Sequence, residues 1–257
     1  MSRVRSTVTA IAVLLATILI WELAVQGLGI RKFILPAPSV VLVELFSHFP
    51  YYASEASSTL MVTLAGFALA VAGGIALAVA IVSSRILDVT LYTLLVALNA
   101  VPKVALAPLF VIWLGTSSAP KVAIACLIAI FPIVIDTVLG LRAIDPEMIS
   151  MAKAARASRR HVMFKIRFPN ALPSLFAGMK VGISFALIGA IVGEFVAGES
   201  GLGSVILNSQ SAFNTPRAFA AIVLLSVIGT VLFFIVDFAE RLLLPWHVSQ
   251  RGVSGGH

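Results

Sequence analysis

Residues 218–236 read AFAAIVLLSVIGTVLFFIV, nineteen consecutive positions without a charged side chain. A helix needs about 20 mainly apolar residues to cross the roughly 30 Å hydrocarbon layer of a bilayer. This stretch therefore predicts a membrane-spanning helix, which we expect to extend over residues 218–243.

The rest of the chain repeats this pattern. Sixty per cent of the 257 residues are hydrophobic and 11% are charged, whereas soluble domains have about 25% charged residues. So few charges favour lipid as the solvent, and the longest hydrophilic stretch, 142–173, is too short for a core of its own. We predict an all-α polytopic membrane protein with one transmembrane domain over residues 1–257 and about six spans. The other five are expected at 8–27, 59–82, 89–113 (interrupted by Pro102 and Pro108), 121–141 and 175–196.

The basic residues predict the orientation of the chain. Cytoplasmic loops carry an excess of Lys and Arg, and six spans place both termini on one side. With the termini inside, four basic loop residues fall outside, namely Arg31, Lys32, Lys121 and Arg217. Twelve fall inside, namely Arg3, Arg5, Arg85, Arg142, Lys153, Arg156, Arg159, Arg160, Lys165, Arg167, Arg241 and Arg251. We therefore expect cytoplasmic termini and, although the net charge is +7, no nucleic-acid partner.

Small residues recur at every fourth position in two of the expected spans. One series is Gly66, Ala70 and Gly74, and the other is Gly178, Gly182, Ala186 and Ala190. This spacing lets helix backbones approach closely in lipid. It predicts tight packing of both helices, either within the subunit or at a dimer seam.

The most informative stretch is the loop from Asp145 to Pro173. Asp145 can cap a helix, Pro146 suits its first position, and Glu147 complements the helix dipole. One helical face then carries Met148, Met151, Ala152 and Ala155. We expect a second short helix over residues 161–168, ended by Pro169 and Pro173. An amphipathic helix beside so many arginines fits either anionic lipid headgroups or a protein partner.

This loop resembles the signature loop of binding-protein-dependent ABC transporter permeases. That family carries Glu-Ala-Ala, three residues, Gly, and an apolar stretch ending in two prolines. The residues that match here are Asp145, Pro146, Glu147, Ala152, Ala155, Ala157, Ser158, Arg159 and the segment Pro169–Pro173. The resemblance implies a type I ABC importer permease fold. It also implies a coupling helix on an ATPase subunit, made by Asp145, Glu147, Met148, Ala152, Ala155, Arg156, Ser158, Arg159 and Arg160.

Further motifs carry the resemblance along nearly the whole chain and point to the nitrate, sulfonate, taurine and pyrimidine-precursor branch. They are Leu35–Ser39, Asn99–Gly115, Gly193–Phe195, Gly201–Gly203 and Glu240–Trp246. The loop departs from the family pattern at Ser150, Met151 and Arg156. Arg156 replaces the motif's glycine, so we expect either a helical turn there or two short helices that run together.

Ionisable groups at membrane depth usually have a function or a partner. Lys103, in the broken third span, could meet an anionic substrate or pair with Glu194. Asn99 could line a path or bond to a neighbouring helix, and Glu194 could act as a gate or in a structural pair. Asn99, Lys103 and Glu194 are thus candidate path residues. Lys180 is expected to snorkel to headgroups, and Asp237 to pair with Arg241.

The sequence lacks the motifs of an enzyme or an ATPase. It has no G-x-x-x-x-G-K-[ST] phosphate loop, no H-E-x-x-H pair and no G-x-S-x-G elbow. We therefore expect no cofactor or metal in this chain, with ATP and Mg²⁺ bound by a partner ATPase.

The expected function is the permease subunit of an ATP-driven importer in the bacterial inner membrane. Its expected partners are ABC ATPase subunits, a second permease copy and an extracytoplasmic substrate-binding protein. The substrate would be a small anionic or heteroaromatic solute. The alternatives are a stand-alone secondary transporter or channel, whose halves often repeat, and a membrane enzyme or scaffold.

Overall fold

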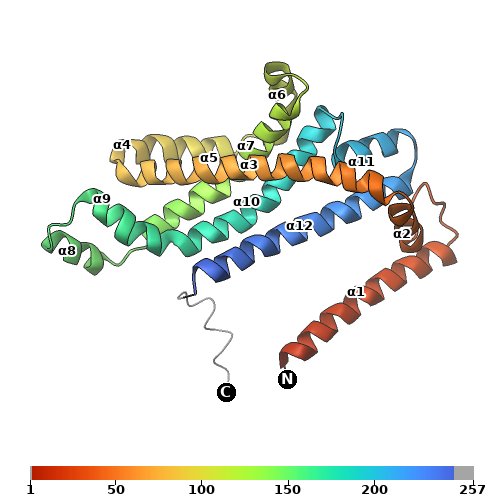
Figure 1. The fold of residues 1–257 in the computed structure, drawn as a ribbon, viewed down its shortest axis with the longest axis horizontal. Coiled ribbons are helices and arrows are strands. Elements are labelled where there is room, and N and C mark those ends of the chain that lie inside the picture. The colour runs from red at the N-terminus through yellow and green to blue at the C-terminus, as the bar shows by residue number, and fades with distance from the viewer. Residues whose placement is uncertain (1, 246–257) are drawn as a thin grey trace. The chain divides into compact units, whose positions relative to one another are not determined.

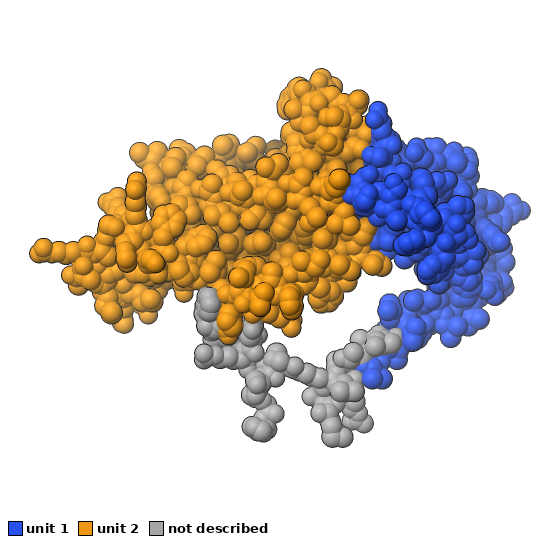
Figure 2. Space-filling view, in the orientation of Figure 1, with its two compact units in different colours: residues 1–58, 198–226 blue, residues 59–197, 227–257 orange. Residues whose placement is uncertain are grey.

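The computed structural model describes residues 2–245, which form helices joined by short turns and contain no strand (Figure 1). The helical fold predicted from the apolar stretches is confirmed. Arg251, expected on the cytoplasmic side, and Trp246, the last residue of the motif that begins at Glu240, lie outside the described residues. By their internal contacts the residues divide into two compact units, 1–58 with 198–226, and 59–197 with 227–257, which Figure 2 colours separately.

Unit 1 holds α1 (Ser2–Gly27), α2 (Pro38–Ser47), the first turns of α3 (Phe49–Ser83), α11 (Leu202–Ser211) and the first turns of α12 (Thr215–Leu243). The sequence of residues 40–49, apolar with Glu44 and His48, is compatible with a short interfacial helix, and the structure has a helix there, α2. Pro38 starts it, because the first turn of a helix needs no N–H from that residue.

Unit 2 holds the rest of α3 and α12 together with the middle of the chain. Its other elements are α4 (Arg85–Leu87), a π-helical turn (Asp88–Tyr92), α5 (Thr93–Asn99), a 3₁₀ turn (Lys103–Leu106), α6 (Ala107–Leu114), α7 (Ser118–Arg142), α8 (Pro146–Ala154), α9 (Arg159–Val162), a π-helical turn (Met163–Arg167) and α10 (Phe168–Val196).

The core of unit 2 is built on α7, which packs against both α3 and α10. A Cβ placed on Gly66 would lie 2.5 Å from the Ala125 Cβ, and one on Gly178 would lie 2.9 Å from the Pro132 carbonyl oxygen. Such distances leave no room for a side chain, so glycine is required for these backbones to meet. The predicted tight packing is therefore confirmed, and it lies within the subunit, with α7 between the two small-residue stripes.

The predicted count of six spans is not confirmed. Four helical stretches are long and apolar enough to cross a bilayer: residues 49–83, 118–142, 159–196 and 215–243. A fifth arises if the segments Arg85–Asn99 and Lys103–Leu114, which are bent by 89°, count as one broken span. The part of α1 from Ala12 to Gly27 is apolar but shorter than these four stretches.

Two proline assignments were wrong. Pro169 and Pro173 were expected to end a short helix, yet the helical stretch runs from Arg159 to Val196. Pro169 lies in the first turn of α10, directly after a π-helical turn that already shifts the hydrogen-bond register, and Pro173 lies inside the helix. Pro50 likewise lies in the first turn of α3, so that helix begins ten residues before the predicted Thr59.

Candidate translocation and coupling sites

The break in the third span places Lys103 in non-α-helical backbone. After α5 ends at Asn99, Pro102 leads into the 3₁₀ turn that begins at Lys103. The Lys103 ammonium donates to the Asn99 side-chain oxygen at 2.8 Å and to its carbonyl oxygen at 3.2 Å. Two of the three predicted path residues are thus brought together, and the side-chain bond lies within one segment of the chain rather than between helices.

The Lys103 ammonium also lies 4.3 Å from the centre of the Phe131 ring, which α7 supplies. A cation over an aromatic face is held by the ring quadrupole. No ion pair joins Lys103 to Glu194 within residues 2–245, so the pairing that the sequence left open is not formed. Phe131 was missed, since one Phe in an apolar helix gives no sequence signal.

Glu194 lies elsewhere in unit 2, where the end of α10 meets the start of α7. It is fully buried, and Lys121 is 4% exposed. A Cβ on Gly193 would lie only 2.8 Å from the Lys121 Cα, so the two helices touch through their backbones there. Lys121 was assigned to an outer loop, and that assignment was wrong because α7 begins earlier, at Ser118. Gly189 and Gly193, which extend the small-residue stripe, were the available signal.

The predicted coupling loop begins with a capped helix. The Glu147 N–H donates to the Asp145 carboxylate at 2.9 Å, which confirms Asp145 as the cap of α8. Ser158 caps the next helix, α9, by accepting from the His161 N–H at 3.2 Å. Both helices lie at one end of unit 2 (Figure 1).

Arg156 joins these two helices in a left-handed conformation, with φ of +52°. The Ala157 N–H donates back to the Ala152 carbonyl at 2.9 Å, which is the hydrogen bond that closes a Schellman turn. Both expectations for this position were therefore wrong. The turn keeps the backbone that glycine normally provides, although a residue with a Cβ occupies it.

The predicted apolar face of α8 is divided in the structure. Ala152 is buried, whereas Met148 and Met151 are 51% and 76% exposed, and Ala155 is also exposed. Arg156, Arg159 and Arg160 are exposed beside them. The two methionines thus form an apolar contact surface on the outside of the loop, bordered by cations.

Lys180 differs from the snorkelling residue that was expected. Its ammonium lies 2.7 Å from Asp237 and 2.5 Å from Glu240, both on α12. The predicted pair between Asp237 and Arg241 is confirmed at 2.7 Å. The sequence offered no signal for the link between α10 and α12, since 57 residues separate Lys180 from Asp237.

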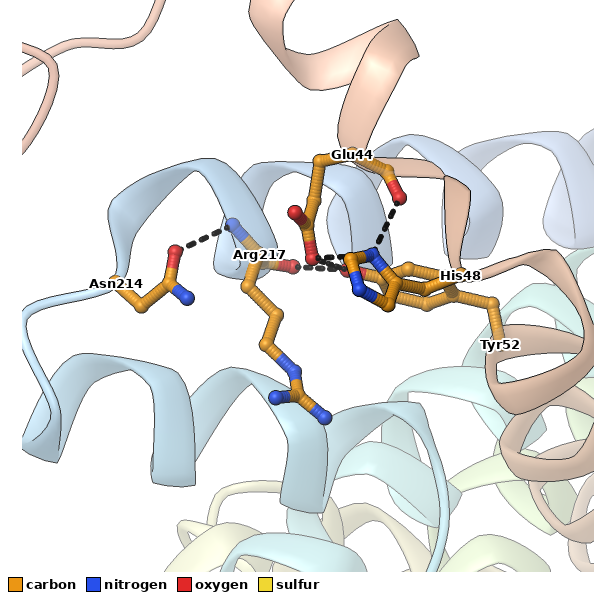
Figure 3. A network of polar contacts seen from close by, with 5 residues as sticks. All are labelled: Glu44, His48, Tyr52, Asn214 and Arg217. Carbon is orange, nitrogen blue, oxygen red and sulfur yellow. Dashed lines mark hydrogen bonds and ion pairs between the residues drawn. The ribbon is translucent and has the colours of Figure 1, made fainter. Parts of the chain in front are cut away.

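Unit 1 contains a polar network that the sequence did not predict (Figure 3). The buried Tyr52 hydroxyl lies 3.2 Å from a Glu44 carboxylate oxygen and 3.4 Å from the Arg217 carbonyl oxygen. His48 lies 3.3 Å from the same carboxylate, and the Asn214 side chain accepts from the Arg217 N–H at 3.3 Å. The network connects α2, α3 and the start of α12.

From its sequence, the segment 198–216 is either a plain polar connection or, by the family resemblance, a part of the extracytoplasmic mouth where a binding protein would dock. In the structure it contains the helix α11. Its Leu202 and Val205 are buried, and the Gly201 N–H donates to Glu55 at 2.6 Å. The helix ends at Ser211, and the turn after it contains Phe213, which has φ of +53° and is 80% exposed. The segment is therefore a folded part of unit 1 rather than a plain loop.

These features define a class. The apolar helices pack through glycine contacts, one span is broken, and a capped amphipathic loop lies between two spans. This combination is typical of a polytopic α-helical membrane transport protein. Residues 70–245 match the family described as binding-protein-dependent transport system inner membrane component, and the chain belongs to that family.

Three relatives illustrate the match. The chain is 36% identical to the riboflavin transport system permease protein of Chloroflexus aurantiacus, over 92% of this chain and 89% of that one. It is 30% identical to the formylaminopyrimidine transport permease protein of Halalkalibacterium halodurans, over 92% and 94%. It is 28% identical to the putative aliphatic sulfonates transport permease protein of Bacillus subtilis, over 91% and 86%.

The predicted family is confirmed, and so is the predicted function. The chain is a multi-pass membrane protein and the permease subunit of an ABC importer for a small solute, which implies an inner-membrane location and both an ATPase and a substrate-binding partner. The matches support this function over a stand-alone secondary transporter or channel. The family is one of transport permeases rather than enzymes.

Proposed function

We propose that the chain, acting as one transmembrane domain over residues 1–257, forms the inward path for a small heteroaromatic solute and operates as a pair of identical copies. One structural observation supports a heteroaromatic solute as the substrate. Lys103 is presented from a broken span, beside the Asn99 amide and over the Phe131 ring. Irregular backbone at membrane depth is tolerated where it lines a cavity or is buried in protein.

The chemistry of this group suits a flat, polar ring. An ammonium group can bind a carbonyl oxygen or a ring nitrogen, an amide can donate and accept, and an aromatic face can stack. Two relatives with at least 30% identity are named for riboflavin and formylaminopyrimidine, both heteroaromatic, and a third, also 30% identical, is named without a substrate. The sulfonate, nitrate and taurine permeases are 26–29% identical. Glu194, buried on α10, is proposed as a further path residue.

The coupling site is proposed on the outer surface of α8 and the turn after it. Met148 and Met151 would enter an apolar groove of the ATPase, and Arg156 would meet acidic groups beside it, while Arg159 and Arg160 would hold the loop in place without contacting the ATPase. Asp145 and Ser158 would keep the two short helices in shape because they cap them, and Ala152 because it is buried. Glu147 and Ala155, both exposed, are proposed as further residues of the coupling surface. The exposure of both methionines supports this assignment, since large apolar side chains outside a membrane favour a partner.

The remaining parts of the importer follow from this arrangement. The ATPase would bind ATP and Mg²⁺, and this chain would hold no cofactor. The excess of basic residues in the loop 142–173 supports a cytoplasmic position for the loop and for both termini. The substrate-binding protein would then dock on the extracytoplasmic side of the membrane.

The test is uptake by the complete importer in sealed vesicles, with the ATPase and the binding protein present. We expect ATP-dependent uptake of riboflavin or of a formylaminopyrimidine, and none of taurine or nitrate. A vesicle containing a hydrolysis-deficient ATPase is the control. ATP-driven uptake of taurine in preference to both ring compounds would reject the heteroaromatic substrate class while leaving the importer function intact.

The coupling assignment needs its own test. The double change M148D/M151D is expected to abolish co-purification of the ATPase, because it places carboxylates in an apolar contact. The matched control is I86D, since Ile86 is also 76% exposed but lies on α4. If M148D/M151D retains the ATPase as well as the unchanged chain does, α8 is not the coupling helix.

A further inference from the structure

A cavity of about 560 Å³ lies in unit 2 between the end of α3 and the segment around α9. One wall is formed by Val79, Val82 and Ser83, in the last turns of α3, and the other by residues 157–167, with Ile149 of α8 at the rim. Its volume is within the range of small-molecule sites. Met148 and Met151 do not line it, so it is separate from the exposed methionines proposed to contact the ATPase.

The cavity is strongly basic. Arg159, Arg160 and Arg167 contribute to its lining, and no acidic residue does. Elsewhere in unit 2 arginines are neutralised, as Arg142 is by Asp88 and Arg241 by Asp237. No ion pair neutralises the three cavity arginines within residues 2–245. Three guanidinium groups around one space, without a carboxylate, favour an anionic ligand with several oxygen acceptors.

The same cavity also has apolar lining, from α3 and from the segment that carries the arginines. Val79, Val82 and Met163 line it, and Val79 lies one turn before the end of the long apolar helix α3. The cavity therefore lies where a membrane span ends, at the level expected for phosphate headgroups. A ligand that fits both walls has an anionic head and a hydrocarbon body.

We propose that this cavity binds one anionic phospholipid. Its phosphate is held by Arg159, Arg160 and Arg167, and the first part of an acyl chain lies against Val79 and Val82. Basic pockets between membrane helices on the cytoplasmic side bind anionic headgroups for the same reason. The inference goes beyond the proposed function, because it depends only on this end of unit 2 lying at the bilayer surface.

The consequence is mechanical. A lipid held here would bridge the end of α3 and the segment around α9, and it would touch Ile149 of α8, the helix proposed to contact the ATPase. It would support α8 from the membrane side. Loss of the lipid should therefore weaken the coupling between ATP hydrolysis and transport before it weakens folding.

The test is native mass spectrometry of the full chain, co-purified with its ATPase and incubated with equal amounts of phosphatidylglycerol and phosphatidylcholine. We expect one phosphatidylglycerol retained per copy. Changing the cavity arginines to Gln should reduce retention roughly fivefold for each arginine removed. The control is R85Q, an exposed arginine on α4 that does not line the cavity, and it should leave retention unchanged.

A second variant keeps the charge and removes the space. V82F fills the apolar wall, so it should also release the lipid although all three arginines remain. Equal retention of both lipids, or phosphatidylglycerol retained by the triple Gln variant, would overturn the proposal. So would loss of the ATPase from the triple variant with the lipid still bound. Displacement of the lipid by millimolar inorganic phosphate would assign the cavity to a soluble anion instead.

Discussion

The Lys180 ammonium lies 2.7 Å from Asp237 and so joins α10 to α12 within unit 2. A second carboxylate, that of Glu240, lies 2.5 Å from the same nitrogen. One lysine thus neutralises two acidic groups on the neighbouring helix, while Arg241 shares Asp237 from the solvent side. The side chains of Lys180, Asp237 and Glu240 are between 12% and 21% exposed, so solvent screens the group only in part.

The first prediction concerns this group. K180M is expected to destabilise the protein by about 1–2 kcal/mol, because it leaves two carboxylates facing each other in a partly dry site. The loss should appear as a melting temperature lower by a few degrees in detergent. K165M, which changes an exposed lysine, is the control. If K180M/D237N/E240Q is no more stable than K180M, the effect is not electrostatic.

The second prediction concerns the left-handed turn after α8. R156G is expected to raise stability by about 0.5–1 kcal/mol, because it removes the strain of a Cβ at φ of +52°. The gain is reduced by the greater freedom of glycine in the unfolded chain. Thermal unfolding of R156G and R156A separates the two causes, since R156A removes the charge and keeps the strain. An equal gain for both changes would mean that the charge, not the backbone, is responsible.

The third prediction concerns the contact between α7 and α10. A Cβ on Gly189 would lie 2.6 Å from the Ala125 Cα. G189A should therefore force the two backbones apart and cost about 1–3 kcal/mol. In G73A the nearest atom would be 3.4 Å away, at the end of a flexible Ile130 side chain, and little loss is expected. Comparable melting temperatures for the two variants would contradict the close approach.

The fourth prediction concerns the proposed substrate path. F131L is expected to lower kcat/KM for ATP-driven uptake about tenfold, since it removes the ring that holds the Lys103 ammonium. K103Q should lower it at least as much, whereas K32Q, at an exposed position outside the apolar helices, should have no effect. ATPase co-purification verifies that each variant assembles. Unchanged uptake in both F131L and K103Q would remove this group from the path.

Whether a feature of this protein could be predicted from its sequence depends on how far apart in the chain the interacting residues lie. The apolar spans, the α2 helix and the Asp145 cap were predictable because they depend on neighbouring residues. The Asp237 and Arg241 pair was also predictable, since residues four apart share a helix face. The links from Lys180 to Asp237 and from Lys103 to Phe131 were not, since each requires the packing of two separate helices.

The prolines and Arg156 show where local rules were misapplied. Pro169 and Pro173 carry the usual signal for a helix end, yet the preceding π-helical turn and the surrounding packing keep the helix continuous. The arginine at 156 argued against a left-handed turn, yet the hydrogen bond from Ala157 to Ala152 is formed. In both places the packing of the whole unit outweighs a local backbone preference, against proline inside a helix or against a non-glycine residue in a left-handed turn. Each preference amounts to about 1–3 kcal/mol.

Hydrophobicity and the order of motifs were enough to predict that this protein lies in lipid, that it is helical and to which family it belongs, because both depend on residues close together in the chain. Tertiary structure decided which polar groups meet, that α7 lies between two glycine stripes, and that three arginines surround one cavity. Those relationships join residues far apart in sequence, and only the packing of helices in three dimensions brings such residues within contact distance.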